Sequence, residues 1–188
     1  MTSQSTERGM ALVVVAMTLV LVLAIAAGLV LTTTSEALTA ENFRRSQQAL
    51  YAAEAAAEWV VADLPSVASD WATVLNTTVT SRFVDGPAGG SRGLADGSFL
   101  NLTDVADRNA SWKPYAWGPL RDLLPPPSGP TQPSAFYIVV FVASDAESSD
   151  HLQVRAEAHG PRGTHKMLDL RLLRDSSGVH VVSWAERR

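Results

Sequence analysis

An uncharged apolar run of 22 residues, from Met10 to Leu31, is the feature that most constrains the fold of this chain. As a helix rising 1.5 Å per residue, the run measures roughly 33 Å, which matches the ~30 Å hydrocarbon core of a bilayer. Thr18 is its only strongly polar side chain. A soluble core helix that is apolar on all sides is unusual in a chain of 188 residues. We therefore expect the run to reside in a membrane, at least transiently.

Three fates are open to such a run: removal as a signal peptide, retention as a membrane anchor, and burial in the interface of a polymer. The Ala-Ile-Ala triplet at 24–26 fits the small-residue pattern of a signal-peptide cleavage site. Two observations weaken this interpretation: Glu7 offsets Arg8 ahead of the run, and the apolarity continues beyond the triplet. The positive-inside rule gives no orientation, because Arg8 lies on one side and the arginines at 44–45 lie on the other.

The segment that follows the run predicts a continuous helix. It contains no proline or glycine between Leu29 and Leu64 and is rich in Ala, Glu, Gln, Leu and Arg, which favour helix. Pro65 is expected to end the helix. We expect residues 10–31 to be apolar on all sides and residues 32–64 to form an amphipathic continuation. A cleavable signal has no need to continue into such a helix.

The short polar leader, the apolar run and the Ala-rich helix together resemble the class III signal of type IV pilin-like proteins. The closer resemblance is to the PilX family of minor pilins. It rests on RGMALVVVAMTLVLVLAIAAGL, from Arg8, and on ENFRRSQQALYAAEAAAEW, from Glu41 to Trp59. It covers roughly the first 60 residues, and the terminal VHVVSWAERR is similar to the ending of some of these proteins.

The resemblance implies that residues 1–9 are a leader peptide and that a prepilin peptidase cuts after Gly9 and methylates the new amine of Met10. Glycine suits the cut, because a missing side chain lets the peptidase approach the backbone closely. The fifth mature position is Val14, where pilins that build the shaft usually carry Glu. In the family that carboxylate pairs with the terminal amine of a neighbouring subunit, and an unpaired buried charge costs several kcal/mol. Val14 thus favours an initiating or tip subunit, or it is simply another lipid-facing residue.

The function implied by the resemblance is structural, not enzymatic: a minor pilin of a type IV pilus that helps to initiate or tip filament assembly. The partners expected are other pilins and minor pilins through the N-terminal helix, the prepilin peptidase, the inner-membrane assembly platform and membrane lipid. The expected location is a single pass of the inner membrane, with the N terminus cytoplasmic and the head extracytoplasmic, and then the pilus. Two alternatives stay open: a tip-type pseudopilin of type II secretion, and a membrane-anchored extracytoplasmic binding module unrelated to filaments.

Residues 65–134 are expected to form an irregular connecting region rich in Gly and Pro. DWATVLNTTVT, from Asp70, is ambiguous between a short helix and a strand, and LLPPPSGPTQP, from Leu123, predicts a polyproline-like connector. SWKPYAWGPL, from Ser111, groups three aromatic residues. Aromatic side chains serve more often as core or loop anchors than as an exposed binding patch.

Residues 135–188 contain four segments that predict strands: AFYIVVFVAS, HLQVRAEAHG, HKMLDLRLLRD and GVHVVSWAE. The short turns between them, SDAESSD, GPRG and DSSG, indicate an antiparallel meander. Its apolar face needs a cover, which the Ala-rich helix supplies. The predicted fold class is therefore α+β and pilin-like. A long N-terminal helical spine, transmembrane in its first half, packs on a C-terminal four-stranded antiparallel sheet.

The sequence predicts no catalytic residues, no cofactor and no metal site. Its four histidines, His151, His159, His165 and His180, match no ligand motif, although His151 and His159 are placed to share a strand face. Three acidic residues of one turn offer hard oxygens for calcium but more often are simply solvated: Asp145, Glu147 and Asp150. Cysteine is absent, which excludes disulfides and thiolate chemistry. A net charge of -4 gives no footprint for nucleic acid.

Overall fold

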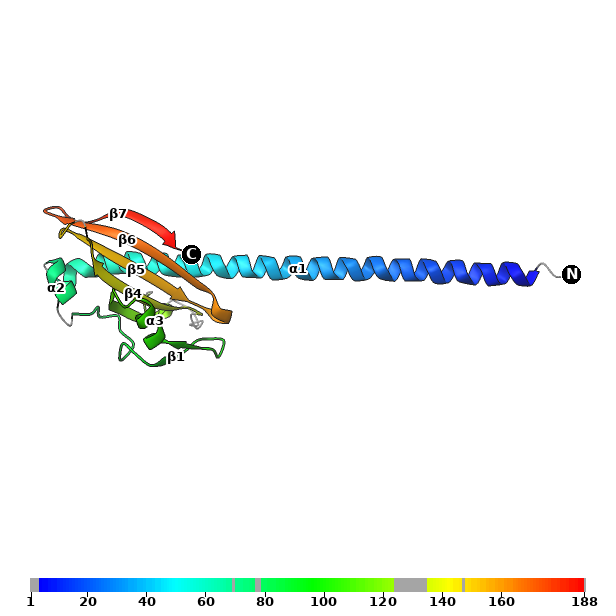
Figure 1. Ribbon diagram of the computed structural model, residues 1–188, viewed down its shortest axis with the longest axis horizontal. Coiled ribbons are helices and arrows are strands. Elements are labelled where there is room, and N and C mark those ends of the chain that lie inside the picture. Colours follow the sequence, from blue (N-terminus) through cyan, green and yellow to red (C-terminus); the bar gives the residue numbers. More distant parts are fainter. Residues whose placement is uncertain (1–3, 69, 77–78, 124–134, 147, 188) are drawn as a thin grey trace, which may run out of the picture. The chain divides into compact units, whose positions relative to one another are not determined.

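The computed structural model describes residues 4–68, 70–76, 79–123, 135–146 and 148–187 (Figure 1). The chain divides into two compact units, Met1–Arg44 and Arg45–Arg188. The first contains only helix, and the second, which we call the head, contains the sheet and the rest of that helix.

Helix α1 spans Gln4–Val67, so the predicted continuity across residues 29–64 is confirmed. It ends three residues later than expected, because Pro65 lies inside its last turn and does not stop it. A proline near the end of a helix removes one backbone donor while the following residues still bond. The amide of Ala68 donates to the carbonyl of Leu64 at 3.2 Å, which closes the final turn.

The head contains a five-stranded antiparallel sheet in the order β3-β4-β5-β6-β7. Its strands are β3 (Lys113–Pro119), β4 (Tyr137–Ser144), β5 (His151–His159), β6 (His165–Asp175) and β7 (Gly178–Arg187). The α+β class and the meander of β4 to β7 are confirmed.

The predicted strand number of four was wrong, because β3 adds a fifth strand beside β4. The sequence did not indicate β3, because Pro114 and Pro119 are of a residue type that usually interrupts a strand. Proline lacks a backbone N–H and is tolerated on an edge strand, where one side needs no partner. β3 is the last strand on this side of the sheet, although Tyr115 and Trp117 bond on its outer side to residues 81–85, and its pairing with β4 is irregular between Pro114 and Ala116.

The two faces of the sheet are covered by different elements (Figure 1). One face packs against the part of α1 that lies in the head, through the small side chains Ala49, Ala52, Ala53, Ala56 and Ala57 followed by Val60 and Leu64. These small residues let the helix approach the aliphatic side chains of β4, β5 and β6 closely. Helix α3 (Leu102–Arg108) packs against the other face through Leu102 and Val105.

The connecting region, predicted to be irregular, in fact carries several short elements. They are α2 (Trp71–Asn76), β1 (Ser91–Gly93), β2 (Phe99–Asn101), α3, β3 and the 3₁₀ turn η1 (Leu120–Asp122). The ambiguous segment after Asp70 is thus a helix over its first part. Side chains define the turns locally: Asn101 caps α3 by accepting from the amide of Thr103 at 3.0 Å. Residues 124–134, which hold the predicted polyproline connector, lie outside the described residues.

The aromatic group of β3 anchors the core, as favoured from the sequence. Tyr115 and Trp117 are buried, and Trp112 packs against the α3 side of the sheet. The hydroxyl of Tyr115 donates to Asp63 Oδ2 at 2.8 Å and so ties β3 to α1. Burial, the hydrogen bond to Asp63 and its charge all raise the pKa of Tyr115. These side chains therefore do not form an exposed binding patch.

Candidate functional site

The first unit presents a continuous apolar surface on the helix. Every large apolar side chain from Met10 to Leu31 is exposed; Met10 is 72% exposed and Val14 is 56% exposed. Among the described residues, α1 is one helix whose length and composition would allow it to cross a membrane. A surface of this kind is unstable in water and stable in lipid or against other apolar helices. By its length and composition, this helix is therefore suited to anchoring the chain in a membrane.

The threonines of this helix hide their polar groups. The hydroxyl of Thr18 donates to the carbonyls of Val14 and Val15, at 3.0 and 2.9 Å. Those of Thr32, Thr33 and Thr34 donate to carbonyls four residues earlier, at 3.0, 2.9 and 2.8 Å. A hydroxyl satisfied by its own helix backbone carries a smaller cost in hydrocarbon. The segment compatible with lipid thus continues past Leu31.

The predicted processing residues lie at the start of this helix. Gly9 and Met10 are both within α1, and Val14 lies one turn further along. The side chain of Val14 is exposed, and its carbonyl receives the Thr18 hydroxyl. No acidic or basic side chain occurs between residues 10 and 31, so the fifth mature position has no substitute carboxylate nearby in the sequence.

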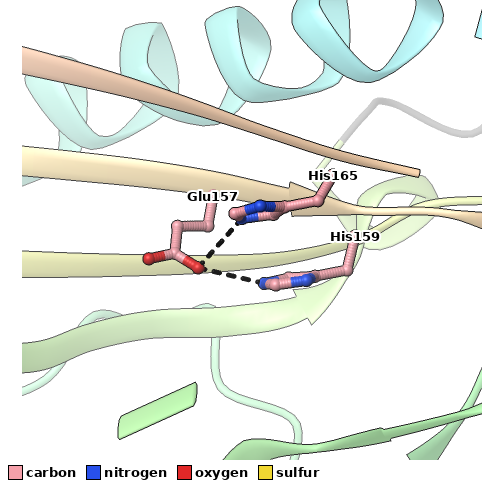
Figure 2. A group of neighbouring side chains, drawn as sticks. All are labelled: Glu157, His159 and His165. Atoms are coloured by element: carbon pink, nitrogen blue, oxygen red, sulfur yellow. Dashed lines mark hydrogen bonds and ion pairs between the residues drawn. The ribbon is translucent and has the colours of Figure 1, made fainter. Parts of the chain in front are cut away.

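A second group, which the sequence did not predict, lies in the head at the turn between β5 and β6. Glu157, His159 and His165 converge there (Figure 2). His165 Nε2 and His159 Nε2 each lie 3.2 Å from Glu157 Oε2. The two imidazole rings are stacked, with centroids 4.5 Å apart and planes inclined by 18°. Figure 2 shows both rings directed at the same carboxylate oxygen.

This cluster is buried on the α3 face of the sheet. Glu157 is 1% exposed and His159 is 7% exposed, whereas His165 lies at the surface. Burial acts to raise the pKa of Glu157, but its contacts with His159, His165 and Asn109 outweigh burial and hold that pKa well below its usual range. Burial lowers the pKa of His159. The contacts of Glu157 therefore favour its ionised form, while burial disfavours the charged form of His159.

The carboxylate of Glu157 is fixed from behind by a polar network. Asn109 Nδ2 donates to Glu157 Oε1 at 2.8 Å, and Asn109 Oδ1 accepts from Arg155 Nη1 at 3.0 Å. Arg155 makes a two-pronged ion pair with Asp169, with distances of 2.7 and 2.9 Å. The guanidinium of Arg155 also lies over the ring of Trp112, 4.3 Å from its centroid. This network leaves Glu157 Oε2 directed at the histidines.

The structure separates the histidines and the acidic residues considered in the sequence. His151 and His159 have the same strand parity but lie at opposite ends of β5. His180 lies beside Ser177 and Asp175 in the last turn. For the calcium candidates, the Asp145 carboxylate forms an ion pair with Arg171, and Glu147 lies outside the described residues. The charge of the Asp145 carboxylate is therefore already neutralised by Arg171.

A groove of about 350 Å³ runs along the edge strand β7 in the head. It is lined by residues of α1, β6 and β7: Glu54, Ala57, Glu58, Val61, Leu168, Leu170, Val181 and Trp184. Trp184 is 62% exposed, so this groove presents an aromatic ring at the surface, unlike the buried Tyr115 and Trp117 of β3. Exposed apolar surface of this kind is a common feature of interaction sites.

Comparison with known proteins supports the N-terminal part of this description. Residues 8–58 match the family model described as PilX N-terminal. No curated protein and no solved structure matches the chain. The matched range contains the apolar run of α1 and the Ala-rich stripe that packs on the sheet. Residues 8–58 therefore match the PilX N-terminal domain, and this match indicates a type IV pilus-related pilin.

Proposed function

We propose that this protein is a minor pilin of a type IV pilus, a structural subunit without catalytic activity that helps to initiate or tip the filament. The observation that carries the proposal is the uncharged, exposed apolar surface of residues 10–31 within the PilX N-terminal match. The proposed partners of that surface are membrane lipid before assembly and the N-terminal helices of other pilins afterwards. Transfer from lipid to helices gains little hydrophobic free energy, so close packing and an assembly platform must drive it.

The leader would be removed by a prepilin peptidase after Gly9, with methylation of the Met10 amine. Both residues lie within the first two turns of α1, close to its N-terminal end. Glycine is also a weak helix former. The first turns therefore unwind at low cost, which a peptidase that binds an extended backbone requires.

Val14 supports a position at the end of the filament. A carboxylate at the fifth mature position, usual in shaft pilins, pairs with the terminal amine of a neighbouring subunit. Val14 offers no such partner, and burying an unpaired ammonium costs several kcal/mol. A subunit whose Val14 faces no other N terminus avoids that cost, and a tip subunit meets this condition.

Mass spectrometry of the mature chain from membranes tests the assignment. We expect a chain that begins with N-methylated Met10. Replacing Gly9→Val should leave the leader attached, because the added side chain obstructs the backbone, whereas Gly28→Ala should be processed normally. A mature chain that starts at Ala27, or normal processing of the Gly9 variant, would contradict the proposal.

Immunogold labelling of filaments tests the tip position. We expect label at one end of each filament for the wild-type chain. Val14→Glu restores the missing carboxylate and should allow label along the shaft. Label along the shaft of wild-type filaments would contradict the tip role while leaving the pilin assignment intact. Label on a short periplasmic pseudopilus instead of a surface filament would favour the type II secretion alternative.

The alternative of an anchored binding module has lost its main support. It relied on exposed aromatic residues near Trp112, and Tyr115 and Trp117 are buried in the core. Trp184 is exposed, but it lies on β7 in the groove, apart from that loop. A chain that is never processed at Gly9 would revive this alternative.

A further inference from the structure

We propose that Glu157, His159 and His165 form a zinc-binding site at the turn between β5 and β6. The strand register brings the three together, because His159 pairs directly with His165 and Glu157 lies two positions earlier on the same face. Their ligand atoms all lie within 4.8 Å of one another. The site belongs to the head and does not depend on the proposed role of the N-terminal helix.

The separation of the ligand atoms suits a small divalent cation. Each Nε2 atom lies 3.2 Å from Glu157 Oε2. Tetrahedral Zn²⁺ with bonds of about 2.0–2.1 Å holds neighbouring ligand atoms about 3.3 Å apart. Two imidazoles and one carboxylate form a known type of zinc site, in which a fourth position remains for water or another donor.

His159 gives a second and independent indication. Its Nε2 atom is buried and has no hydrogen-bond partner, although it lies 3.2 Å from Glu157 Oε2. A buried polar atom without a hydrogen bond costs about 1–3 kcal/mol, and native proteins usually avoid it. In its neutral form an imidazole has a lone pair on one ring nitrogen, which can bind a metal. Coordination of Zn²⁺ would satisfy that atom.

The residues behind the cluster hold the Glu157 carboxylate in a fixed orientation. Metal-ligating carboxylates are normally hydrogen-bonded through their other oxygen, which orients them. Asn109 does this for Glu157 Oε1 at 2.8 Å, and Arg155 holds Asn109 in turn at 3.0 Å. The Glu157 carboxylate is therefore held in place before a metal ion binds. A carboxylate in a solvent-exposed salt bridge would remain free to move.

One adjustment is required on binding. The imidazole rings are stacked with an inclination of 18°, so their lone pairs are nearly parallel. Coordination of one ion needs the rings to tilt toward a common point. His165 is exposed, so its ring can tilt and a metal ion can reach it from solvent. The two imidazoles and one carboxylate form an N₂O donor set, which suits first-row divalent ions such as Zn²⁺ better than Ca²⁺ or Mg²⁺.

Titration of the full-length chain in detergent with ZnCl₂ tests the site. The protein is prepared without a polyhistidine tag, and a chelator first removes any bound metal. Calorimetry should show one Zn²⁺ bound per chain, and Zn²⁺ should raise the thermal unfolding midpoint of the head. His165→Gln should weaken binding at least 10–100-fold, the range measured for loss of a mere second-shell partner, and should abolish the thermal shift. Co²⁺ in place of Zn²⁺ should give the visible absorption of a tetrahedral ion.

Three variants make the result specific. His180→Gln removes a histidine outside the cluster and should leave zinc binding unchanged. Asn109→Ala should weaken binding about 10–100-fold without removing a ligand. His165→Gln changes an exposed residue and should keep the circular dichroism of the wild type, so loss of binding cannot come from unfolding. Absence of stoichiometric zinc binding by the wild-type chain, or equal binding by His165→Gln, would overturn the site.

Discussion

The same helix behaves differently in the two units of the molecule. In residues 10–31 its apolar side chains are all exposed, and most of them are large: Leu, Val, Ile and Met. From Ala49 to Leu64 its inward side chains are buried, and most of them are alanine. The second part has its partner, the sheet, in the same chain. The first part has the stronger need for a partner, and that partner is lipid or another protein. Burial, and not helix formation, distinguishes the two parts.

Replacement of one leucine in each part gives the largest expected contrast. Leu64 is fully buried, so Leu64→Ala should lower the free energy of unfolding of the head by about 2–5 kcal/mol through a cavity. Leu23 is exposed, so Leu23→Ala should leave that free energy unchanged. Denaturant titration of the full chain in detergent, followed by tryptophan fluorescence, measures both. Equal effects would show that the two parts of the helix are not distinguished by burial.

A lysine placed at an exposed position should have different effects in residues 10–31 and in the head. Leu21→Lys puts an ammonium near the centre of the apolar run and should weaken membrane insertion by about 3 kcal/mol. Tyr51 is exposed in the head, and Tyr51→Lys should affect neither insertion nor stability by more than about 0.5 kcal/mol. The fraction of each protein that resists alkaline extraction from membranes provides the measurement. Full retention of the Leu21 variant would argue against a lipid environment for that surface.

Glycine replacement sharpens the contrast in packing. A Cβ atom added at Gly160 would overlap the ring of Phe136, so Gly160→Ala should cost the head about 1–3 kcal/mol. A Cβ atom at Gly28 meets nothing within 4 Å, so Gly28→Ala should not change the stability of the head. Thermal unfolding of both variants tests this. A destabilised Gly28 variant would reveal a packing partner of residues 10–31 within the chain.

The head and residues 10–31 should also respond differently to pH, and this is the smallest of the expected effects. Hydrogen bonds from Ser98 and Arg162 lower the pKa of Asp96 to about 2. Because the folded pKa lies below the unfolded value of about 3.9, Asp96 stabilises the head above pH 4 and loses this contribution as pH falls to about 2. Residues 10–31 contain no titratable side chain. Asp96→Asn should therefore lower the thermal midpoint slightly at neutral pH and not at pH 2, while membrane insertion stays independent of pH.

Most of the fold was predictable because local signals agreed. The absence of glycine and proline between Leu29 and Leu64 predicted one helix, and strict alternation predicted β5 and β6. β3 was missed because Pro114 and Pro119 are local signals against a strand, and only its position at the sheet edge makes them acceptable. The extent of α1 past Pro65 was missed for a similar reason, since a lost donor costs little in a last turn.

The metal cluster was missed because the histidines were paired by sequence along one strand. His151 and His159 share a parity, but a strand extends about 3.3 Å per residue, which separates them by about 26 Å. The useful signal was the turn after His159, which predicts that His165 folds back opposite it. Glu157 then joins by alternation. The buried network behind it could not be predicted, because Asn109 caps the C-terminal end of α3, a helix that the sequence pattern did not indicate.

The amide group of Asn109 links elements that are far apart in the chain. Its nitrogen donates both to the carbonyl of Val105 and to Glu157, and its oxygen accepts from Arg155. Detaching α3 from the sheet would break these bonds together and leave the Glu157 carboxylate without its fixed donor. Local opening of α3 therefore has a high free energy for a helix of seven residues. Its amide protons should exchange with solvent as slowly as those of β5, so that the connecting segment and the sheet open as one cooperative unit.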